Sequence, residues 1–177
     1  DVILISDIDE IPNLSNLDLK KFDQKILSFK QKFFYYKFNY LSLEYPSWYG
    51  TKLCKRKNLK SPQWLRSLKT YKQYPFYRLD KILFSKNYEH SCSIIEDGGW
   101  HFSWIGDSKT IVDKIESTAH TELNKKEIKD IKNIEEYISN KRSFVDKSNF
   151  KTVDIKSTLP NYIYQNREKF RQFLDEN

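Results

Sequence analysis

The sequence predicts a mixed α/β domain in which strands come first along the chain and helices come last. Val2–Ser6 is a short apolar run of the kind found in central strands that are covered on both faces. Residues 26–43 are dense in aromatic and β-favouring side chains. From Asp107 onward, apolar residues recur at helical spacing. A chain of 177 residues fits one domain, so we expect a single domain over 1–177.

Strands are predicted where β-favouring residues run between turn residues. They lie over 2–6, 26–43, 51–55, 92–96 and 100–104. In the longest of them, a period of two places Phe34, Tyr36, Phe38 and Tyr40 on one face. The last two strands are expected to flank a turn at Asp97-Gly98-Gly99.

Helices are predicted where a capping residue or a proline precedes a periodic apolar pattern. They lie over 14–22, capped by Asn13 or Ser15, after Ser61-Pro62, from Asp107 onward, and after Pro160. Ile111, Ile115 and Ala119 should share one face. Two pairs have capping-box spacing: Asn124 with Glu127, and Asn133 with Glu136. The last helix should turn four apolar residues inward: Ile163, Phe170, Phe173 and Leu174.

Composition narrows the classes of partner. The formal charge of +7 suits an anionic partner, whether a nucleotide diphosphate, nucleic acid or an acidic membrane surface; a solvated lysine-rich surface is the alternative. The aromatic share of 16% suits a core, and also surfaces that bind sugars. Cys54 and Cys92 form neither a disulfide framework nor a zinc site and suit a reducing compartment, so we expect a cytoplasmic protein, with membrane contact only at the periphery.

The chain contains no Met and opens directly on a predicted buried strand. We therefore expect that a segment precedes Asp1 in the complete protein. A phosphate loop, a dinucleotide-binding glycine motif and a serine nucleophile elbow are all missing from the sequence.

The strongest motif is Asp7-Ile8-Asp9-Glu10, which directly follows the first predicted strand. Ligands of α/β sheets bind beyond the carboxyl ends of the strands, which is where these acids lie. If the strand continued, Asp7 and Asp9 would point the same way. Two carboxylates suit a hard divalent cation that bridges them to a diphosphate and neutralises charge on the departing phosphate. Solvated loop acids or helix caps are the alternative interpretation.

The second motif runs from Gly98 to Trp104, with the sequence Gly-Gly-Trp-His-Phe-Ser-Trp. Paired glycines allow a tight turn or a close approach to a ligand. His101 lies between aromatic residues and is a candidate metal ligand or diphosphate contact, with a structural role as the alternative. Gly99 and Trp100 are candidate substrate-binding residues beside it.

Arg66 is a further candidate because it lies in a strongly basic stretch, residues 52–72. An arginine fork can hold a leaving diphosphate through two hydrogen bonds, although a plain surface charge is the alternative.

Both motifs resemble those of glycosyltransferase family 17, which includes the enzyme that adds bisecting N-acetylglucosamine to glycoproteins. Residues 4–12 resemble the family's acidic signature, and residues 98–104 its second signature, about ninety positions later. Residues 114–124 and 159–170 resemble the segments that follow. Residues 141–144 depart from the expected glycine-rich pattern.

This resemblance implies the C-terminal portion of a GT-A-like nucleotide-sugar transferase fold, a mixed sheet followed by helices. It also implies a UDP-sugar donor, a divalent metal (Mn²⁺ or Mg²⁺) and inverting transfer to a glycan or glycoconjugate acceptor. N-acetylglucosamine is the expected sugar, and nucleic acid is not an expected partner. Asp7 and Asp9 take the metal-motif role. Because family members carry a longer segment before the acidic motif, the N-terminal nucleotide-binding strands are expected to be missing from residues 1–177.

An inverting transfer needs a general base, usually a carboxylate, and Asp97 and Glu10 are the candidates. Two other functions remain open at this stage. A non-catalytic glycan-binding domain would keep the motifs without turnover, and a basic nucleic-acid-binding module would use the positive charge.

Overall fold

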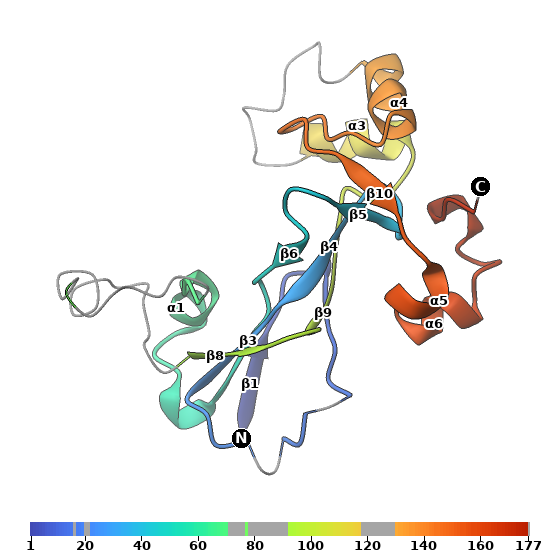
Figure 1. Cartoon of the computed structure of the whole chain (residues 1–177). Helices are drawn as coiled ribbons and strands as arrows, with labels where there is room; N and C mark the ends of the chain where they lie inside the picture. The colour runs from blue at the N-terminus through green and yellow to red at the C-terminus, as the bar shows by residue number, and fades with distance from the viewer. Residues whose placement is uncertain (16, 20–21, 71–76, 78–91, 118–129, 177) are drawn as a thin grey trace. The chain divides into compact units, whose positions relative to one another are not determined.

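The computed structural model describes the chain except residues 16, 20–21, 71–76, 78–91, 118–129 and 177 (Figure 1). It is mixed α/β, with two sheets and short helices, so the predicted fold class is confirmed at this level. The described residues group into two compact units, one over Asp1–Lys32 and Ser47–His101, the other over Phe33–Pro46 and Phe102–Asn177. The two units are groups of residues with many contacts inside each group, and they do not decide how many domains the chain has. The single domain therefore stays a prediction.

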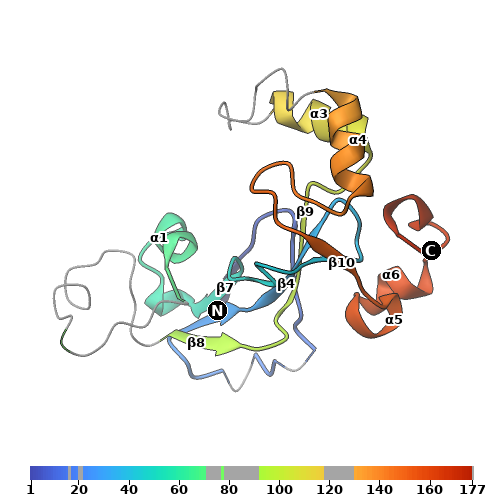
Figure 2. The ribbon, with the colours of Figure 1, turned by 45° about the horizontal axis from the view of Figure 1, so that its top comes forward.

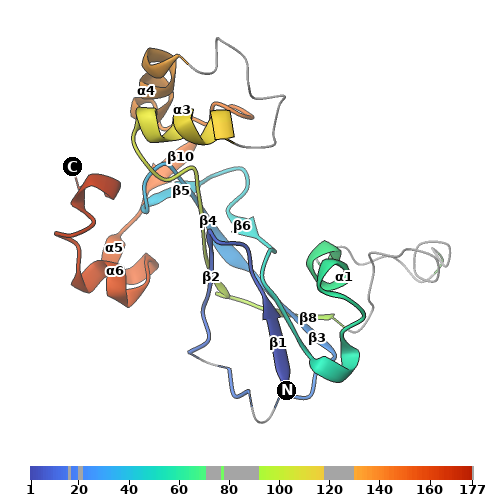
Figure 3. The same ribbon diagram turned by 180° about the vertical axis from the view of Figure 1, so that it is seen from behind.

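The first unit is built on a four-stranded sheet (Figures 1 and 3). Its strands follow the order β1 (Val2–Ile5), β7 (Lys52–Lys55), β3 (Ile26–Phe29) and β8 (Cys92–Ile95). The β1–β7 and β7–β3 pairs are antiparallel, and β3 pairs with β8 in parallel. A 3₁₀ turn (Arg56–Asn58) and helix α1 (Pro62–Ser67) follow β7.

Strand β1 is confirmed, but its predicted central position is wrong. Among the described strands it ends the order of its sheet, and Leu4 is 37% exposed. The strand covered on both faces is β3, of which all four residues are buried. Its polar member Ser28 is satisfied by the Thr70 hydroxyl, with 2.7 Å between the oxygens. An apolar run alone did not distinguish the two positions.

The single long strand predicted over 26–43 is wrong. The segment contains three strands: β3, β4 (Gln31–Tyr35) and β5 (Tyr40–Ser42). Tyr36 has a φ of 62°, which ends the extended chain, and the Tyr40 N–H donates to the Lys37 carbonyl across the turn at 3.2 Å. Phe34 then faces Leu41 in an antiparallel pair. The alternation of faces therefore stops at Tyr36.

The strands predicted at 92–96 and 100–104 are confirmed as β8 and β9 (Gly99–Ser103), but they do not pair with each other. In the first unit β9 pairs with β2 (Glu10–Pro12), and β6 (Ser47–Trp48) pairs with β4. Asp97 and Gly99 both have positive φ, at 50° and 121°. The Gly98 N–H donates to the Lys30 carbonyl, so this turn is fixed by the β3–β4 junction.

The helix predicted over 14–22 is wrong for the described part of that range, which forms turns and irregular chain. Asn13 caps a turn, its side-chain oxygen accepting from the Ser15 N–H at 3.2 Å. Phe22, 3% exposed, packs with Leu27 and Leu53 in the core of the first unit. Burial of Phe22 outweighed local helical preference here.

The helix predicted at Ser61-Pro62 is confirmed as α1. The Ser61 hydroxyl accepts from the Trp64 N–H at 3.1 Å, and Pro62 occupies the first turn. Leu65 and Leu68 pack with Ile26 and Cys54 beneath the sheet strands β3 and β7. The cap and the proline define a helix that the sequence could predict locally.

In the second unit, α3 (Ser108–Ser117) and α4 (Ile131–Ser139) pack as a pair (Figure 2). Ile111 and Ile115, which were predicted to share one face, both lie on α3 and are buried. Ala119 and the Asn124–Glu127 pair lie outside the described residues. The predicted cap at Asn133 is wrong, because Asp130 caps α4 by accepting from the Lys132 N–H at 2.9 Å.

The C-terminal part of the second unit contains β10, which pairs with β5, and three short helical segments. These elements are β10 (Phe150–Thr152), α5 (Ile155–Thr158), α6 (Asn161–Gln165) and a 3₁₀ turn (Arg171–Phe173). Pro160 precedes α6 as predicted. Of the four residues predicted to turn inward, Ile163 and Leu174 are buried, whereas Phe170 and Phe173 are only partly buried. The helix is shorter than expected, since the chain turns after Gln165.

Among the helices in the described part of the chain, none is both long and apolar enough to cross a membrane.

Asp175 connects the C-terminal end of the second unit to β10 and to the segment after α4. Its carboxylate accepts hydrogen bonds from Lys141 at 2.8 Å and Thr152 at 2.9 Å. Burial opposes ionisation, but these hydrogen bonds outweigh it and lower the pKa of Asp175 below its usual value of 3.8. A lowered folded-state pKa adds stability above the unfolded-state pKa, and that stability is lost as pH falls through the folded-state pKa.

We therefore expect Asp175→Asn to lower the free energy of unfolding by about 1–2 kcal/mol at pH 7. The difference from the wild type should shrink as the pH falls below about 4, near the usual carboxyl pKa. Urea denaturation at several pH values measures both effects. Glu168→Gln, at a side chain that is 79% exposed, is the control. A difference that does not change with pH contradicts the assignment.

Candidate functional site

The acidic motif forms a tight turn between β1 and β2. The Glu10 N–H donates to the Asp7 carbonyl at 3.1 Å, and the Ser6 hydroxyl donates to the Glu10 carbonyl at 3.0 Å. Ile8 at the tip is fully exposed. Because β1 ends at Ile5, the strand geometry that would turn Asp7 and Asp9 the same way is not present.

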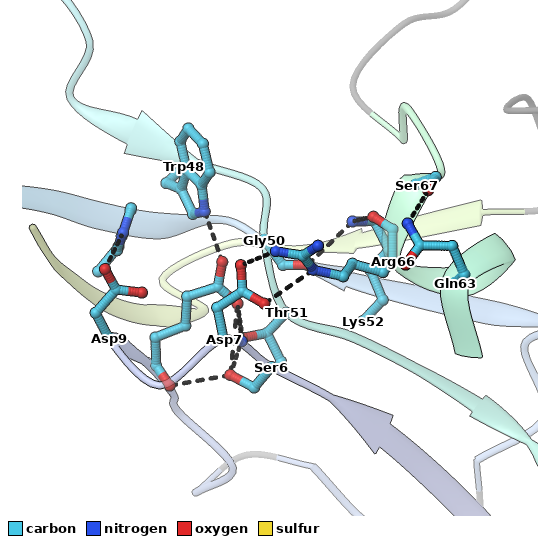
Figure 4. A network of polar contacts seen from close by, with 12 residues as sticks. Ser6, Asp7, Asp9, Trp48, Gly50, Thr51, Lys52, Gln63, Arg66 and Ser67 are labelled. Atoms are coloured by element: carbon cyan, nitrogen blue, oxygen red, sulfur yellow. Dashed lines mark hydrogen bonds and ion pairs between the residues drawn. The ribbon is translucent and has the colours of Figure 1, made fainter. Parts of the chain in front are cut away.

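Asp7 faces Arg66 on α1 (Figure 4). The Arg66 Nε donates to one carboxylate oxygen at 2.9 Å, and a terminal nitrogen donates to the other at 2.7 Å. This fork-to-fork pair raises the pKa of Arg66, chiefly through the hydrogen bond to Asp7. Both side chains are about half exposed, so the pair lies at the surface of the first unit.

Asp9 turns instead toward His101, with 3.3 Å between its carboxylate and the histidine Nε2. His101 is buried on β9, and the Trp48 ring lies beside its imidazole, with 4.7 Å between centroids. The two aspartates of the motif thus have different partners: Asp7 an arginine, and Asp9 a histidine from the second motif.

The two sequence motifs are paired residue by residue. In the antiparallel β2–β9 ladder, Glu10 lies opposite His101, Ile11 opposite Trp100, and Pro12 opposite Gly99. Segments about ninety positions apart therefore lie on adjacent strands of the first unit.

Gly99 is required by this pairing. Its φ of 121° disfavours any L side chain, and a Cβ there would lie 2.1 Å from the Ile11 carbonyl oxygen. Trp100 is half-buried, and its carbonyl accepts a long hydrogen bond from Gln31 at 3.5 Å. Gly99 therefore has a steric role: the absence of a side chain allows β9 to lie beside Ile11 and Pro12.

Glu10 is the buried centre of the turn. One carboxylate oxygen accepts from the Trp48 indole N–H at 2.7 Å. The other accepts from the Thr51 hydroxyl at 3.1 Å and from the Asp7 N–H at 3.0 Å. Gly50 passes so close that a Cβ there would overlap the carboxylate, at 1.6 Å. Glu10 thus positions both the acidic turn and the ring of Trp48.

A pocket of about 250 Å³ opens beside this turn within the first unit. Its walls come from the acidic turn, the segment before β7, and α1. They combine aromatic, charged, amide and hydroxyl groups, including Asp7, Trp48, Tyr49, Gln63, Arg66 and Ser67. A partly exposed indole with several hydrogen-bonding groups is suited to a small polar ligand that also has an apolar face.

Lys52 borders the pocket, and its side chain is 3% exposed. Its ammonium donates to the carbonyls of Tyr49, Gly50 and Arg66, at 3.3, 3.0 and 3.0 Å. Burial lowers the pKa of Lys52, against the opposing effect of nearby groups such as Glu10. These three hydrogen bonds join α1 to the segment that carries Trp48.

Asp97 lies apart from these residues. It forms an ion pair with Lys32, and its side chain is 66% exposed. The pocket that it lines also includes Asn13 and Gln24, but neither Asp7 nor Glu10. The structure therefore gathers Asp7, Glu10 and Arg66 around one pocket, places Asp9 and His101 on the adjoining turn and strand, and leaves Asp97 at another pocket.

Several pocket residues that can contact a polar ligand were not predicted as site residues, among them Trp48, Tyr49, Lys52, Gln63 and Ser67. Lys52 lies within both the predicted strand 51–55 and the basic stretch 52–72, and neither pattern marks it as a site residue. Lys52 occupies an ordinary strand position in the sequence, and its burial depends on α1 packing against its strand. The one local signal for Trp48 in the sequence was its position two residues before a glycine. Gly50 is needed where the chain passes the Glu10 carboxylate, and Trp48 lies beside that point.

The donor chemistry of Asp7 and Asp9 fits a divalent cation that is shared with a substrate. Magnesium-type ions are commonly held by one or two carboxylates plus substrate phosphates. The described residues contain no group of three or more His, Cys, Asp or Glu side chains placed so that they could hold a metal ion by themselves. Asp7 and Asp9 would supply the protein's oxygens, and phosphate and water the others.

Comparison with family models, curated proteins and solved structures gives no match for this chain.

Glu10→Gln tests the buried network. An amide nitrogen must replace one oxygen and would face a donor, either the Trp48 indole or the Thr51 hydroxyl and Asp7 N–H. We expect the free energy of unfolding to fall by about 1–3 kcal/mol. The Trp48 emission should also shift to longer wavelength as its ring loses its position.

Glu96→Gln is the matched control, because Glu96 forms an ion pair with Lys30 at the surface and is 71% exposed. Chemical denaturation followed by fluorescence measures both variants. Equal stability of Glu10→Gln and the wild type contradicts the positioning role.

Proposed function

We propose that this chain is a metal-dependent, inverting glycosyltransferase of the GT-A type, similar to glycosyltransferase family 17. It transfers a sugar, with N-acetylglucosamine as the first candidate, from a UDP-sugar to a glycan acceptor. The observation that carries the proposal is the pairing of β2 with β9. It puts the acidic motif and the Gly-Gly-Trp-His motif side by side, next to a pocket with Trp48 and Arg66 in its walls.

The charges around this pocket suit a nucleotide diphosphate. Arg66 offers a planar fork with two N–H groups, the geometry that phosphate oxygens accept best. Asp7 and Asp9 are the oxygens available for a divalent cation. When bound, such an ion neutralises negative charge on the leaving diphosphate. The guanidinium of Arg66 on α1 and the two carboxylates of the acidic turn together offer the charges that an anionic, metal-bridged ligand requires.

The uncharged part of the pocket suits a sugar ring. Pyranose rings have a hydrophobic face of C–H groups and a rim of hydroxyls. Trp48 is 42% exposed, and its ring is held by the hydrogen bond to Glu10. Gln63 and Ser67 on α1 supply an amide and a hydroxyl for the rim. We therefore assign sugar contact to Trp48, with α1 providing the polar groups.

The base that accepts the acceptor's proton has two candidates, and their surroundings differ. Glu10 borders the pocket, but both of its oxygens accept hydrogen bonds from the protein, which favours a positioning role. Asp97 is exposed, but it lines a different pocket. Asp97→Asn separates them: lost turnover with unchanged UDP-sugar binding assigns the base to Asp97, and unchanged turnover removes Asp97.

A glycan-binding domain without turnover is the second candidate function. It is favoured by the engagement of Asp7 with Arg66 and of Asp9 with His101. In that case Trp48 would still bind sugar, and the carboxylates would serve only to hold the turn. Sugar binding by the complete protein with no release of UDP distinguishes this function from a transferase.

Donor binding tests the transferase proposal. Isothermal titration of the protein with UDP-N-acetylglucosamine in the presence of Mn²⁺ should give saturable binding. Asp7→Asn combined with Asp9→Asn should weaken it at least about tenfold, because both cation ligands lose their charge. Asp23→Asn, at an exposed aspartate outside the pocket, is the control.

Absence of binding by the wild type, or equal binding by the double variant, contradicts the proposal. The same titration with single- and double-stranded DNA and RNA tests the nucleic-acid alternative. Tight binding that weakens steeply with salt would favour that alternative instead.

A further inference from the structure

We propose that the Asp7–Arg66 ion pair is an exchangeable latch that couples cation binding to diphosphate binding. In the ligand-free protein the Arg66 guanidinium and the Asp7 carboxylate bind each other. On donor binding, Asp7 exchanges Arg66 for the divalent cation, and Arg66 exchanges Asp7 for the diphosphate. This inference rests on the function proposed above and assigns a regulatory role to a contact within that site.

The geometry supports an exchange of equivalent partners. Arg66 uses Nε and one terminal nitrogen on the two oxygens of Asp7, at 2.9 and 2.7 Å (Figure 4). That edge of the guanidinium binds two oxygens of a carboxylate or two of a phosphate in the same fork. Both Asp7 oxygens therefore carry a hydrogen bond from Arg66, and a cation at Asp7 competes with them.

The exchange needs side-chain movement only. The backbone of Arg66 is fixed, because its carbonyl accepts from the buried Lys52 and the neighbouring Leu65 is fully buried on α1. The backbone of Asp7 is fixed by its N–H to the Glu10 carboxylate. Both side chains, in contrast, are about half exposed, at 54% and 42%. Ion pairs at such exposure contribute little net free energy, so the pair can open at low cost.

The consequence is cooperativity between the two ligands. Without diphosphate, Arg66 competes with the cation for Asp7 and weakens cation binding. Without the cation, Asp7 competes with the diphosphate for Arg66. Each ligand removes the competitor of the other, and this coupling must be reciprocal. A plain electrostatic role for Arg66 predicts instead a salt-dependent effect that any nearby cation would share.

The test measures Mn²⁺ binding in the absence of nucleotide, by the electron paramagnetic resonance signal of free Mn²⁺. Arg66→Gln removes the competitor of the cation, so we expect Mn²⁺ to bind roughly two- to fivefold tighter than in the wild type. UDP binding at saturating Mn²⁺, followed by calorimetry, should become about tenfold weaker. Loss of a positive charge alone shifts the two affinities in the same two directions, so the latch is tested by whether the change exceeds that of a variant that removes a charge without removing a hydrogen bond to Asp7.

Lys69→Gln is the matched control, because it removes one positive charge three residues along the chain without removing a hydrogen bond to Asp7. It should leave Mn²⁺ and UDP binding near wild-type values. An equal gain in Mn²⁺ affinity in Arg66→Gln and Lys69→Gln shows a general charge effect and overturns the latch.

Arg66→Lys provides a second variant with the charge retained. Lysine cannot occupy both oxygens of Asp7 as a fork, so Mn²⁺ affinity should again exceed that of the wild type. Unchanged or weaker Mn²⁺ binding in this variant overturns the latch. If the wild type still binds UDP and Mn²⁺, that result leaves the proposed function in place. A wild-type protein that binds neither Mn²⁺ nor UDP overturns both.

Discussion

The buried carboxylate of Glu10 is the interaction on which the proposed site depends. A carboxylate removed from water is costly unless hydrogen bonds replace its hydration. Here the Trp48 indole, the Thr51 hydroxyl and the Asp7 N–H replace it. These donors come from the acidic turn and from the segment that leads into β7. One buried charge therefore fixes the turn that carries the aspartates and the aromatic ring that lines the pocket.

At two positions in this region, close approach of the chain requires a glycine. Gly50 lies where the chain passes the Glu10 carboxylate, and a Cβ would overlap it. Gly99 lies where β9 begins beside Pro12, and there both its φ of 121° and the nearby Ile11 carbonyl exclude a side chain. Close approach between backbones and a buried carboxylate thus explains residues that would otherwise be attributed to ligand contact.

Lys52 is a second buried charge with a comparable role. Its ammonium is surrounded by three backbone carbonyls, including that of Arg66. It therefore connects α1 with the chain around Trp48, while Glu10 connects that chain with the acidic turn. The walls of the pocket are held by hydrogen bonds to two buried charges, and the exposed Asp7–Arg66 pair is the part that ligands can rearrange.

The sequence by itself determined the mixed α/β class, strands β1, β7, β8 and β9, the cap of α1, and the two motifs. These features depend on local patterns: apolar runs, a serine before a proline, and acids after a strand. It failed at 14–22 and 26–43, where burial of Phe22 and the turn at Tyr36 override local preference. The sequence also did not predict the strands with which β8 and β9 pair, among them β3 for β8 and β2 for β9.

Only the tertiary structure decided which candidates meet. In the structure, Glu10 lies opposite His101 in the β2–β9 ladder, Asp7 forms an ion pair with Arg66, and Asp9 contacts His101. Asp97 lies apart, at another pocket. The structure also added Trp48 and Lys52. The physical reason is that strand register and burial are set by contacts between distant segments, which leave no local pattern in the chain. A residue type and its spacing can suggest a chemistry, but only the contacts show which groups are already engaged.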